Sequence, residues 1–163
     1  MLSDRIGEQI PALRRYARAL CGDRDRADDL VQETLLRALA RSGQWRPGSD
    51  LRAWLFTILH NLFVSDCRRE RRWSVSNVTG DRPECGASVE TAGVVRDVER
   101  GLQTLPPEQR ETLLLVVLEG LSYEETARVL GVPKGTVMSR LHRARSRLQA
   151  WMEGEDRSLK VVR

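Results

Sequence analysis

The sequence predicts an all-α protein made of two small helical domains joined by a flexible linker, the second containing a helix-turn-helix. Three observations support this. Apolar residues recur at helical spacing in both halves of the 163-residue chain. No stretch alternates convincingly between apolar and polar residues, as a half-buried strand does. Residues 74–92, between the halves, are rich in Gly, Ser, Thr, Asn and Pro and lack an apolar stripe. We expect domains over 1–73 and 93–152, the linker over 74–92 and a tail over 153–163.

Three amphipathic helices are expected in the first domain. The first breaks at Gly22, and a polar loop separates the second from the third, which Ser49 or Asp50 can cap. The expected core residues are, helix by helix, Ile6, Ile10, Leu13, Ala17 and Leu20; Ala27, Leu30, Val31, Thr34, Leu35, Ala38 and Leu39; and Leu51, Trp54, Leu55, Ile58, Leu59 and Leu62.

The second domain begins with two further expected helices. The first is short and amphipathic, with its apolar residues at Val94, Val95, Val98 and Leu102. The second starts at the prolines of "LPPEQRETLLLVVLEG" and ends at Gly120. Its run "TLLLVVL" is apolar on all sides, which favours a place in the core, although part of the run can form a groove for a partner.

The stretch "SYEETARVLGVPKGTVMSRLHRARSRL" predicts the helix-turn-helix. Ser122 and Glu125 form a capping box, Gly131 ends a short helix, and Pro133 opens a longer basic one. The core stripe of the longer helix comprises Val137, Leu141, Ala144 and Leu148. In such a motif the second helix enters the major groove of DNA.

The remaining faces of this second helix carry the expected DNA contacts. Six Arg or Lys residues and no acidic residue lie between Thr126 and Met152. The early residues of a recognition helix meet base edges, and later cations meet phosphates. The alternative is a basic face that contacts only solvent. The candidate residues are Lys134, Thr136, Met138, Ser139, Arg140, His142, Arg143 and Arg147.

Composition argues against several other classes of protein. The net charge of +4 is by itself weak evidence for an anionic partner. The three cysteines are far apart and only two histidines exist, so we expect neither a metal site nor a cofactor. No nucleophile–base pair or phosphate-binding loop points to an enzyme. No segment resembles a signal peptide or a membrane helix, so we expect a cytoplasmic protein without membrane insertion.

The chain closely resembles bacterial sigma factors of the extracytoplasmic-function (ECF) group. "LPPEQRETLLLVVLEGLSYEETARVLGVPKGTVMSRLHRAR" resembles region 4 of that group, whereas "DRADDLVQETLLRAL" and "LRAWLFTILHNLFVSDCRRERR" resemble region 2. The resemblance implies a protein that joins core RNA polymerase, directs it to promoters and helps melt the DNA. It implies that region 4 reads the −35 element and docks the β flap. It further implies that region 2 grips the β′ clamp and captures the −10 non-template strand. An anti-sigma factor is a further implied partner.

The resemblance also implies roles for region 2 residues. Five acidic residues against two arginines lie between Asp23 and Glu33, which suits a basic protein surface and would repel DNA. A solvated face is the alternative. The expected core-polymerase contacts are Asp28, Asp29, Gln32, Glu33 and Leu36.

The expected −10 contacts lie further along. A basic stretch suits a single strand, and polar side chains can hydrogen-bond an extruded base. The candidates are Asn61, at the start of the family's base-capture loop, with Ser65, Arg68, Arg69, Arg71 and Arg72. Trp54 is expected in the core, and Phe56 and Phe63 belong either to the core or to this surface.

One residue departs from the family pattern. Many members have a cation where this chain has Met138, which offers apolar contact but no hydrogen-bond donor for guanine. The −35 sequence is therefore left open. A helix-turn-helix regulator that is not a polymerase subunit is the alternative function, but it leaves the region 2 motifs unexplained.

Overall fold

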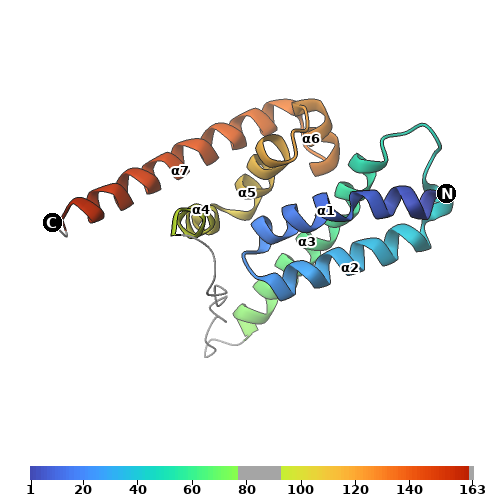
Figure 1. Cartoon of the computed structure of the whole chain (residues 1–163), viewed down its shortest axis with the longest axis horizontal. Coiled ribbons are helices and arrows are strands. Elements are labelled where there is room, and N and C mark those ends of the chain that lie inside the picture. The colour runs from blue at the N-terminus through green and yellow to red at the C-terminus, as the bar shows by residue number, and fades with distance from the viewer. Residues whose placement is uncertain (77–92, 162–163) are drawn as a thin grey trace. The chain divides into compact units, whose positions relative to one another are not determined.

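The computed structural model describes residues 1–76 and 93–161, and within these ranges it contains helices and no strand, as the all-α prediction required. The chain divides into two compact units, an N-terminal unit built on helices α1 to α3 and a C-terminal unit built on α4 to α7 (Figure 1). The linker expected over 74–92 lies outside the described residues, except for its first three positions.

The N-terminal unit comprises α1 (Leu2–Cys21) up to Arg18, α2 (Arg24–Ala40) and α3 (Leu51–Ser76). Most of the expected apolar stripes are buried, and the Tyr16 ring meets the Phe56 ring edge-on with centroids 5.1 Å apart. The assignment of Leu39 to the core is wrong, because this side chain is 50% exposed. At about 100° per residue, Leu39 lies roughly 110° round the helix axis from the centre of the buried stripe of Ala27, Val31, Thr34 and Ala38, so its side chain faces away from the core.

The loop between α2 and α3 contains a short 3-10 helix, η1 (Ser42–Gln44). Asp50 caps α3, since its Oδ1 accepts a hydrogen bond from the backbone N–H of Ala53 at 3.1 Å. The Ser49 hydroxyl instead donates to a carbonyl within the loop. The guanidinium group of Arg5 lies 5.0 Å from the centroid of the Trp45 ring, a cation–π contact that ties this loop to α1.

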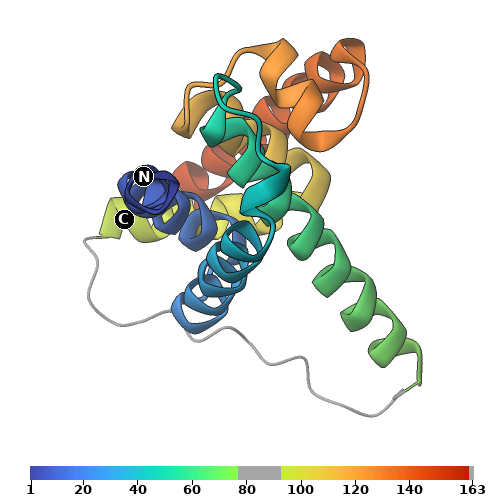
Figure 2. The same cartoon turned by 90° about the vertical axis from the view of Figure 1, so that its right-hand side faces the viewer.

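Helix α3 is uninterrupted over its whole length (Figure 2). Phe56 and Phe63 are 1% and 5% exposed, so both belong to the core. Trp54, expected in the core, is half-buried. The helix continues to Ser76, three residues past the expected end of the domain, because no Gly or Pro interrupts it there.

The C-terminal unit comprises α4 (Gly93–Thr104), α5 (Pro107–Leu113), a π-helical turn η2 (Leu114–Leu118), α6 (Tyr123–Leu130) and α7 (Lys134–Val161). Helix α7 packs against α4, α5 and α6. It runs well past the expected end of the domain, so most of the expected tail is helical. A single glycine, Gly154, costs about 1 kcal/mol in a helix and does not stop it.

Helices α4 and α7 approach closely at Gly101. A Cβ atom at this buried glycine would lie 2.8 Å from Leu148 Cδ1 and 2.9 Å from Trp151 Cε3. Leu102 is buried beside it, whereas Val95 and Val98 of the expected apolar stripe are 46% and 42% exposed. The carboxyl end of α4 therefore packs, and these two valines nearer its start do not.

A buried arginine fixes the corner between α4 and α5. Arg110 is 9% exposed, and its guanidinium group donates to the carbonyl oxygens of Leu102 at 2.8 Å, Gln103 at 3.2 Å and Leu105 at 2.9 Å. Carbonyls at the end of a helix lack partners within it, and a cation there is stabilising. Arg110 is therefore a structural cation.

Candidate nucleic-acid interface

Helix α6 has the predicted capping residues at both of its ends. Ser122 Oγ accepts a hydrogen bond from the Glu125 N–H at 3.1 Å, and Glu125 Oε2 accepts one from the Ser122 N–H at 2.7 Å. Gly131 ends α6 with φ of 64°, a left-handed conformation that glycine adopts without strain. Helix α7 begins directly after Pro133. The predicted capping box and turn are confirmed: the box fixes where α6 begins, and the turn at Gly131 joins α6 to α7.

One side of α7 is buried against the rest of its unit. Val137, Leu141 and Ala144 are 0%, 2% and 0% exposed, and Leu148 is half-buried one turn further on. At about 100° per residue, the side directly opposite this stripe is formed by Gly135, Ser139, His142 and Ser146. We call these four residues the free face of α7.

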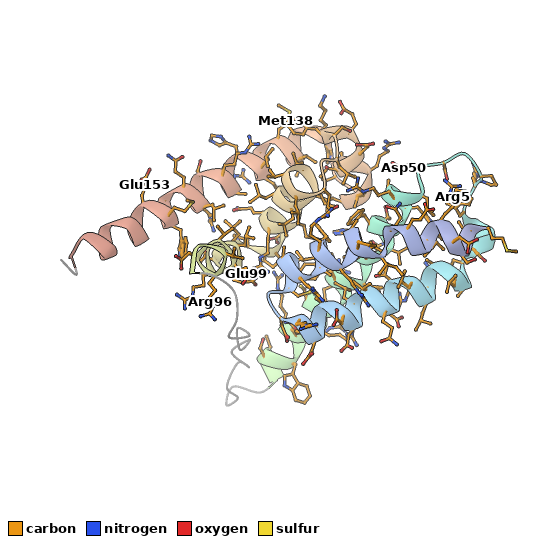
Figure 3. All side chains as sticks on the ribbon, in the orientation of Figure 1. Arg5, Asp50, Arg96, Glu99, Met138 and Glu153 are labelled. Carbon is orange, nitrogen blue, oxygen red and sulfur yellow. The ribbon has the colours of Figure 1, made fainter. Side chains whose placement is uncertain are left out.

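The predicted −35 residues lie on and around this free face. Figure 3 shows Met138 on the outer side of α7, and its side chain is 51% exposed. Thr136, Ser139 and Arg140 are half-buried, with the Ser139 hydroxyl donating to the Thr136 carbonyl at 3.1 Å. The exposed predicted residues are Lys134, Met138, His142, Arg143 and Arg147. Cations beside small polar groups on an accessible helix suit a nucleic-acid groove.

The first residue of α7 is held by its neighbouring helix. Lys134 Nζ donates to Glu124 Oε1 of α6 at 2.5 Å. The hydrogen bond from Lys134 lowers the pKa of the Glu124 carboxyl below its ordinary value of 4.5. The Lys134 ammonium group is therefore an exposed cation that already has an anionic partner. The sequence alone did not indicate this ion pair.

Four of the predicted −10 residues form a straight row on α3. Asn61, Ser65, Arg68 and Arg72 are spaced by four, three and four residues, so they share one helix face over about 16 Å. All four are exposed, and Arg69 and Arg71 flank the row. The placement of Asn61 at the start of a loop is wrong, because α3 continues through it without a helix-breaking residue. The loop of this region instead spans residues 41–50, between α2 and α3.

Acidic side chains near this row form ion pairs with some of the arginines. Asp66 accepts a hydrogen bond from Arg69 within α3, and Glu70 accepts one from Arg26 of α2. The second contact ties the carboxyl-terminal half of α3 to α2. Exposed pairs of this kind are weak in water, so they orient these side chains but leave the arginines able to bind other anions.

A second exposed stripe runs along α2. Asp29, Gln32, Leu36 and Leu39 are spaced by three, four and three residues and therefore share one face. Leu36 is 56% exposed and Leu39 is 50% exposed. The stripe is polar at its amino-terminal end and apolar at its carboxyl-terminal end. Sequence reasoning missed Leu39 because it placed this residue in the core.

The other two predicted contacts of α2 have partners within the N-terminal unit. Asp28 Oδ1 lies 3.9 Å from Arg18 Nη2 of α1. Glu33 Oε1 accepts a hydrogen bond from Arg37 Nε at 2.8 Å. Both pairs are exposed, so a protein partner can compete for these carboxylates.

The π-helical turn exposes apolar side chains on the C-terminal unit. Leu114 and Leu115 are buried, as the apolar run predicts, whereas Val117 is 60% and Leu118 is 37% exposed. The turn begins after the last residue of α5 and closes through the Glu119 N–H, which donates to the Leu114 carbonyl at 3.0 Å. Val117 and Leu118 therefore form a small apolar patch in contact with water.

The described residues give no sign of metal chemistry or of a membrane segment. No three His, Cys, Asp or Glu side chains within 1–76 and 93–161 lie together as a metal site would require. None of the helices in this part of the chain is long and apolar enough to span a bilayer.

Two family models match the two units of the chain. The Sigma2 domain of PhyR matches residues 6–60, and Sigma-70, region 4, matches residues 96–148. ECF RNA polymerase sigma factor EcfG of Rhodopseudomonas palustris is 47% identical over 155 residues, covering 91% of this chain and 83% of that protein. ECF RNA polymerase sigma factor SigE of Mycolicibacterium smegmatis is 35% identical over 145 residues, covering 85% of this chain and 56% of that protein.

Solved structures give the same result. The sigma factor RpoE of Bartonella quintana, in complex with the anti-sigma factor NepR, superposes with a TM-score of 0.82 at 36% identity, covering 93% of this chain and 96% of that one. CnrH in complex with the cytosolic domain of CnrY gives 0.68 at 27% identity, covering 93% and 86%. A plain helix-turn-helix regulator is not favoured, because region 2 is present as well as region 4. The chain belongs to the ECF group of bacterial RNA polymerase sigma factors, which bind core polymerase and direct it to promoter DNA.

Proposed function

We propose that three separate helix surfaces of this sigma factor each bind a different partner. The stripe on α2 binds the β′ clamp of core polymerase, the row on α3 holds the −10 non-template strand, and α7 reads the −35 element. The observation that carries the proposal is that each predicted set of residues lies on an accessible side of its own helix and leaves that helix's core stripe intact.

The α2 stripe suits a basic protein surface with apolar residues beside it. Asp29 carries an exposed carboxylate for a cation of the partner, and Gln32 offers both a donor and an acceptor. Leu36 and Leu39 then lose contact with water on binding, which is worth about 25 cal/mol per Å² of apolar surface. Asp28 and Glu33 join the contact when they exchange their internal arginine partners for cations of polymerase.

The α3 row suits an unpaired DNA strand. Arg68 and Arg72 neutralise phosphates, with Arg69 and Arg71 widening the positive surface on either side. Asn61 and Ser65, at the other end of the row, offer hydrogen-bond donors and acceptors to the edge of an unstacked base. The row therefore favours melted over paired DNA at the −10 element.

The α7 surface suits duplex DNA. Its first turns present Thr136, Ser139 and Met138 towards base edges, with Arg140 and Arg143 beside them. Arg147 lies one turn beyond Arg143 and meets the phosphate backbone. The apolar patch of Val117 and Leu118 on η2 forms part of the surface that docks the β flap.

Further properties follow from membership of this family. We propose that the protein acts in the cytoplasm, where core polymerase is found, and that it has no catalytic activity of its own, as sigma factors in general have none. A protein of the NepR kind, which binds the sigma factor RpoE of Bartonella quintana, is proposed as its inhibitor. Purified NepR-like protein should then suppress promoter-specific transcription when it is titrated against the holoenzyme.

The proposed function is tested by transcription in vitro. Core polymerase reconstituted with this protein should initiate at a discrete set of sites on genomic fragments, and mapping of the start sites should reveal shared −35 and −10 sequences. Core polymerase alone provides the control. Start sites that are the same with and without the protein would rule the proposal out.

A further inference from the structure

Gly135 occupies the second position of α7, in the first turn of the helix that carries the −35 residues. Glycine is an unfavourable residue for a helix, costing roughly 0.5–1 kcal/mol relative to alanine, because it loses the most backbone freedom. The residue at this position is therefore not explained by helix formation.

The backbone conformation of Gly135 does not require glycine either. The described glycines with positive φ are Gly22, Gly48, Gly120 and Gly131, and Gly135 is not among them. Any L-residue can adopt its helical conformation without strain.

Packing within the protein also leaves room at this position. A Cβ atom on Gly135 would meet no heavy atom within 4 Å. Gly101 shows the opposite situation, because a Cβ there would lie 2.8 Å from Leu148 and 2.9 Å from Trp151. The chain's own contacts therefore explain Gly101 and do not explain Gly135.

The location of Gly135 supplies the remaining reason. It is exposed on the free face of α7, directly opposite the core stripe, and it precedes Ser139 by one turn. The first turns of a recognition helix lie deepest in the major groove. A methyl group at Gly135 would point at the floor of that groove and hold the helix backbone away from it.

We propose that Gly135 is the point of closest approach between α7 and the −35 element, where the backbone of the helix lies directly against DNA. This inference rests on the proposed role of α7 at the −35 element. The absence of a side chain lets the first turn sink far enough for the neighbouring Thr136, and for Ser139 one turn later, to reach base edges. Gly135 is thus a positioning residue for promoter recognition.

The test compares side chains of increasing size at one position. Gly135→Ala and Gly135→Met both introduce good helix formers, so helix propensity improves while the space above the helix fills. Gly154→Ala is the matched control, because Gly154 lies on the same helix, is exposed and likewise meets nothing within 4 Å of a Cβ atom. Binding is measured with reconstituted holoenzyme, per active molecule and well below the melting temperature of each variant.

Two promoter probes distinguish the contributions of the two units to DNA binding. The first carries the −35 and −10 elements found by start-site mapping, and the second begins at the −10 element and lacks the −35 duplex. We expect Gly135→Ala to weaken binding of the first probe about tenfold and Gly135→Met to weaken it further. Both variants should bind the second probe as the wild type does, and Gly154→Ala should match the wild type on both probes.

The outcomes distinguish this inference from the proposed function. If the wild type gains nothing from a −35 duplex, the proposed role of α7 fails. If the wild type needs the −35 duplex but Gly135→Ala and Gly135→Met bind it equally well, only the close approach at Gly135 is overturned. An equal loss in Gly154→Ala would also overturn it, because the effect would then belong to the helix as a whole.

Discussion

Glu124 Oε1 accepts a hydrogen bond from Lys134 Nζ at 2.5 Å, which joins the two helices of the helix-turn-helix at the point where α7 begins. Both side chains are more than half exposed. Lys134 was predicted as a DNA contact, and this arrangement places an acidic residue beside it. The Glu124 carboxylate therefore competes with any DNA phosphate for the Lys134 ammonium group.

Replacement of this acid should strengthen DNA binding. In Glu124→Gln the ammonium group of Lys134 loses its anionic partner and becomes available to a phosphate, while one negative charge near the DNA disappears. Holoenzyme should bind a promoter containing the −35 duplex several times more tightly, with the salt slope steeper by up to about one. Glu99→Gln removes the same charge from α4 and should leave the affinity unchanged; equal tightening in both variants would mean a nonspecific charge effect.

The same pair gives a defined dependence of stability on pH. The pKa of Glu124 is lowered in the folded protein, so the folded state favours its charged form. Its contribution to stability is therefore present at neutral pH and above the ordinary value of 4.5, and it is lost as the pH falls through the lowered pKa. The difference in melting temperature between the wild type and Glu124→Gln should be constant near neutrality and vanish in acid. A difference that grows on acidification would contradict the assignment.

Local features of the C-terminal unit could be predicted from sequence alone. The capping box of Ser122 and Glu125 and the left-handed Gly131 depend on residues a few positions apart, so the sequence contains all the information needed to place them. Buried Val137, Leu141 and Ala144 follow from helical spacing for the same reason. The core side of α7 is therefore predictable from the sequence alone.

Features set by packing between helices could not be predicted. Which leucine of α2 lies beyond the core depends on the orientation of that helix against α3, so Leu39 was placed wrongly. The partners of Arg110 are carbonyls whose exposure depends on where α4 ends. Asn61 was placed in a loop by analogy, although the residues around it favour an unbroken helix.

The polymerase surface of α2 is tested by charge reversal at Asp29. This residue is exposed on the stripe with Gln32, so Asp29→Arg should repel a basic partner while changing the free energy of unfolding by no more than about 0.5 kcal/mol. Pull-down of core polymerase should fail with this variant, and thermal melting should be normal. Glu8→Arg, an exposed reversal on α1, should pull down polymerase normally. If Asp29→Arg still binds polymerase, the proposal that this face of α2 contacts polymerase is wrong.

The −10 surface of α3 is tested at Asn61. Asn61→Ala removes the hydrogen-bonding groups proposed for an extruded base, and about 1–3 kcal/mol of binding to the melted strand should be lost. Holoenzyme binding to a labelled single strand containing the −10 sequence measures the loss. Gln149→Ala removes an exposed amide from α7 and serves as the control. If Asn61→Ala weakens every single strand equally, whatever its sequence, then Asn61 does not read a base.

The close contact of α4 with α7 is tested at Gly101. Gly101→Ala places a methyl group within 3 Å of Leu148 and of the rigid Trp151 ring, and overpacking of this kind costs about 1–3 kcal/mol. The melting temperature should therefore fall, whereas Gly154→Ala, which meets no neighbouring atom, should hold or raise it. A rise in both variants would show that helix propensity outweighs packing at Gly101.

The arginines of α7 should separate into base-reading and phosphate-binding residues. Arg140 and Arg143 lie in the early turns, with Arg140 half-buried beside the core stripe and Arg143 exposed. Removing a base contact at Arg140 or Arg143 should cost about 1–3 kcal/mol and relax the sequence preference at one position of the −35 element. Arg147 is exposed one turn later, and Arg147→Ala should weaken all sequences evenly and lower the salt slope by about one.

The measurement uses alanine variants of the full chain in holoenzyme, against a panel of −35 sequences at several salt concentrations. Arg100→Ala removes an exposed cation from α4 and should leave sequence preference intact, which makes it the control for charge alone. Arg140 lies nearer the buried stripe than Arg143 does, so its guanidinium group has less freedom to reach the groove floor. We therefore expect the stronger loss of sequence preference in Arg143→Ala. If Arg140→Ala and Arg143→Ala both lower affinity evenly for every sequence, α7 anchors the DNA by charge and specificity lies in the N-terminal unit or in DNA shape.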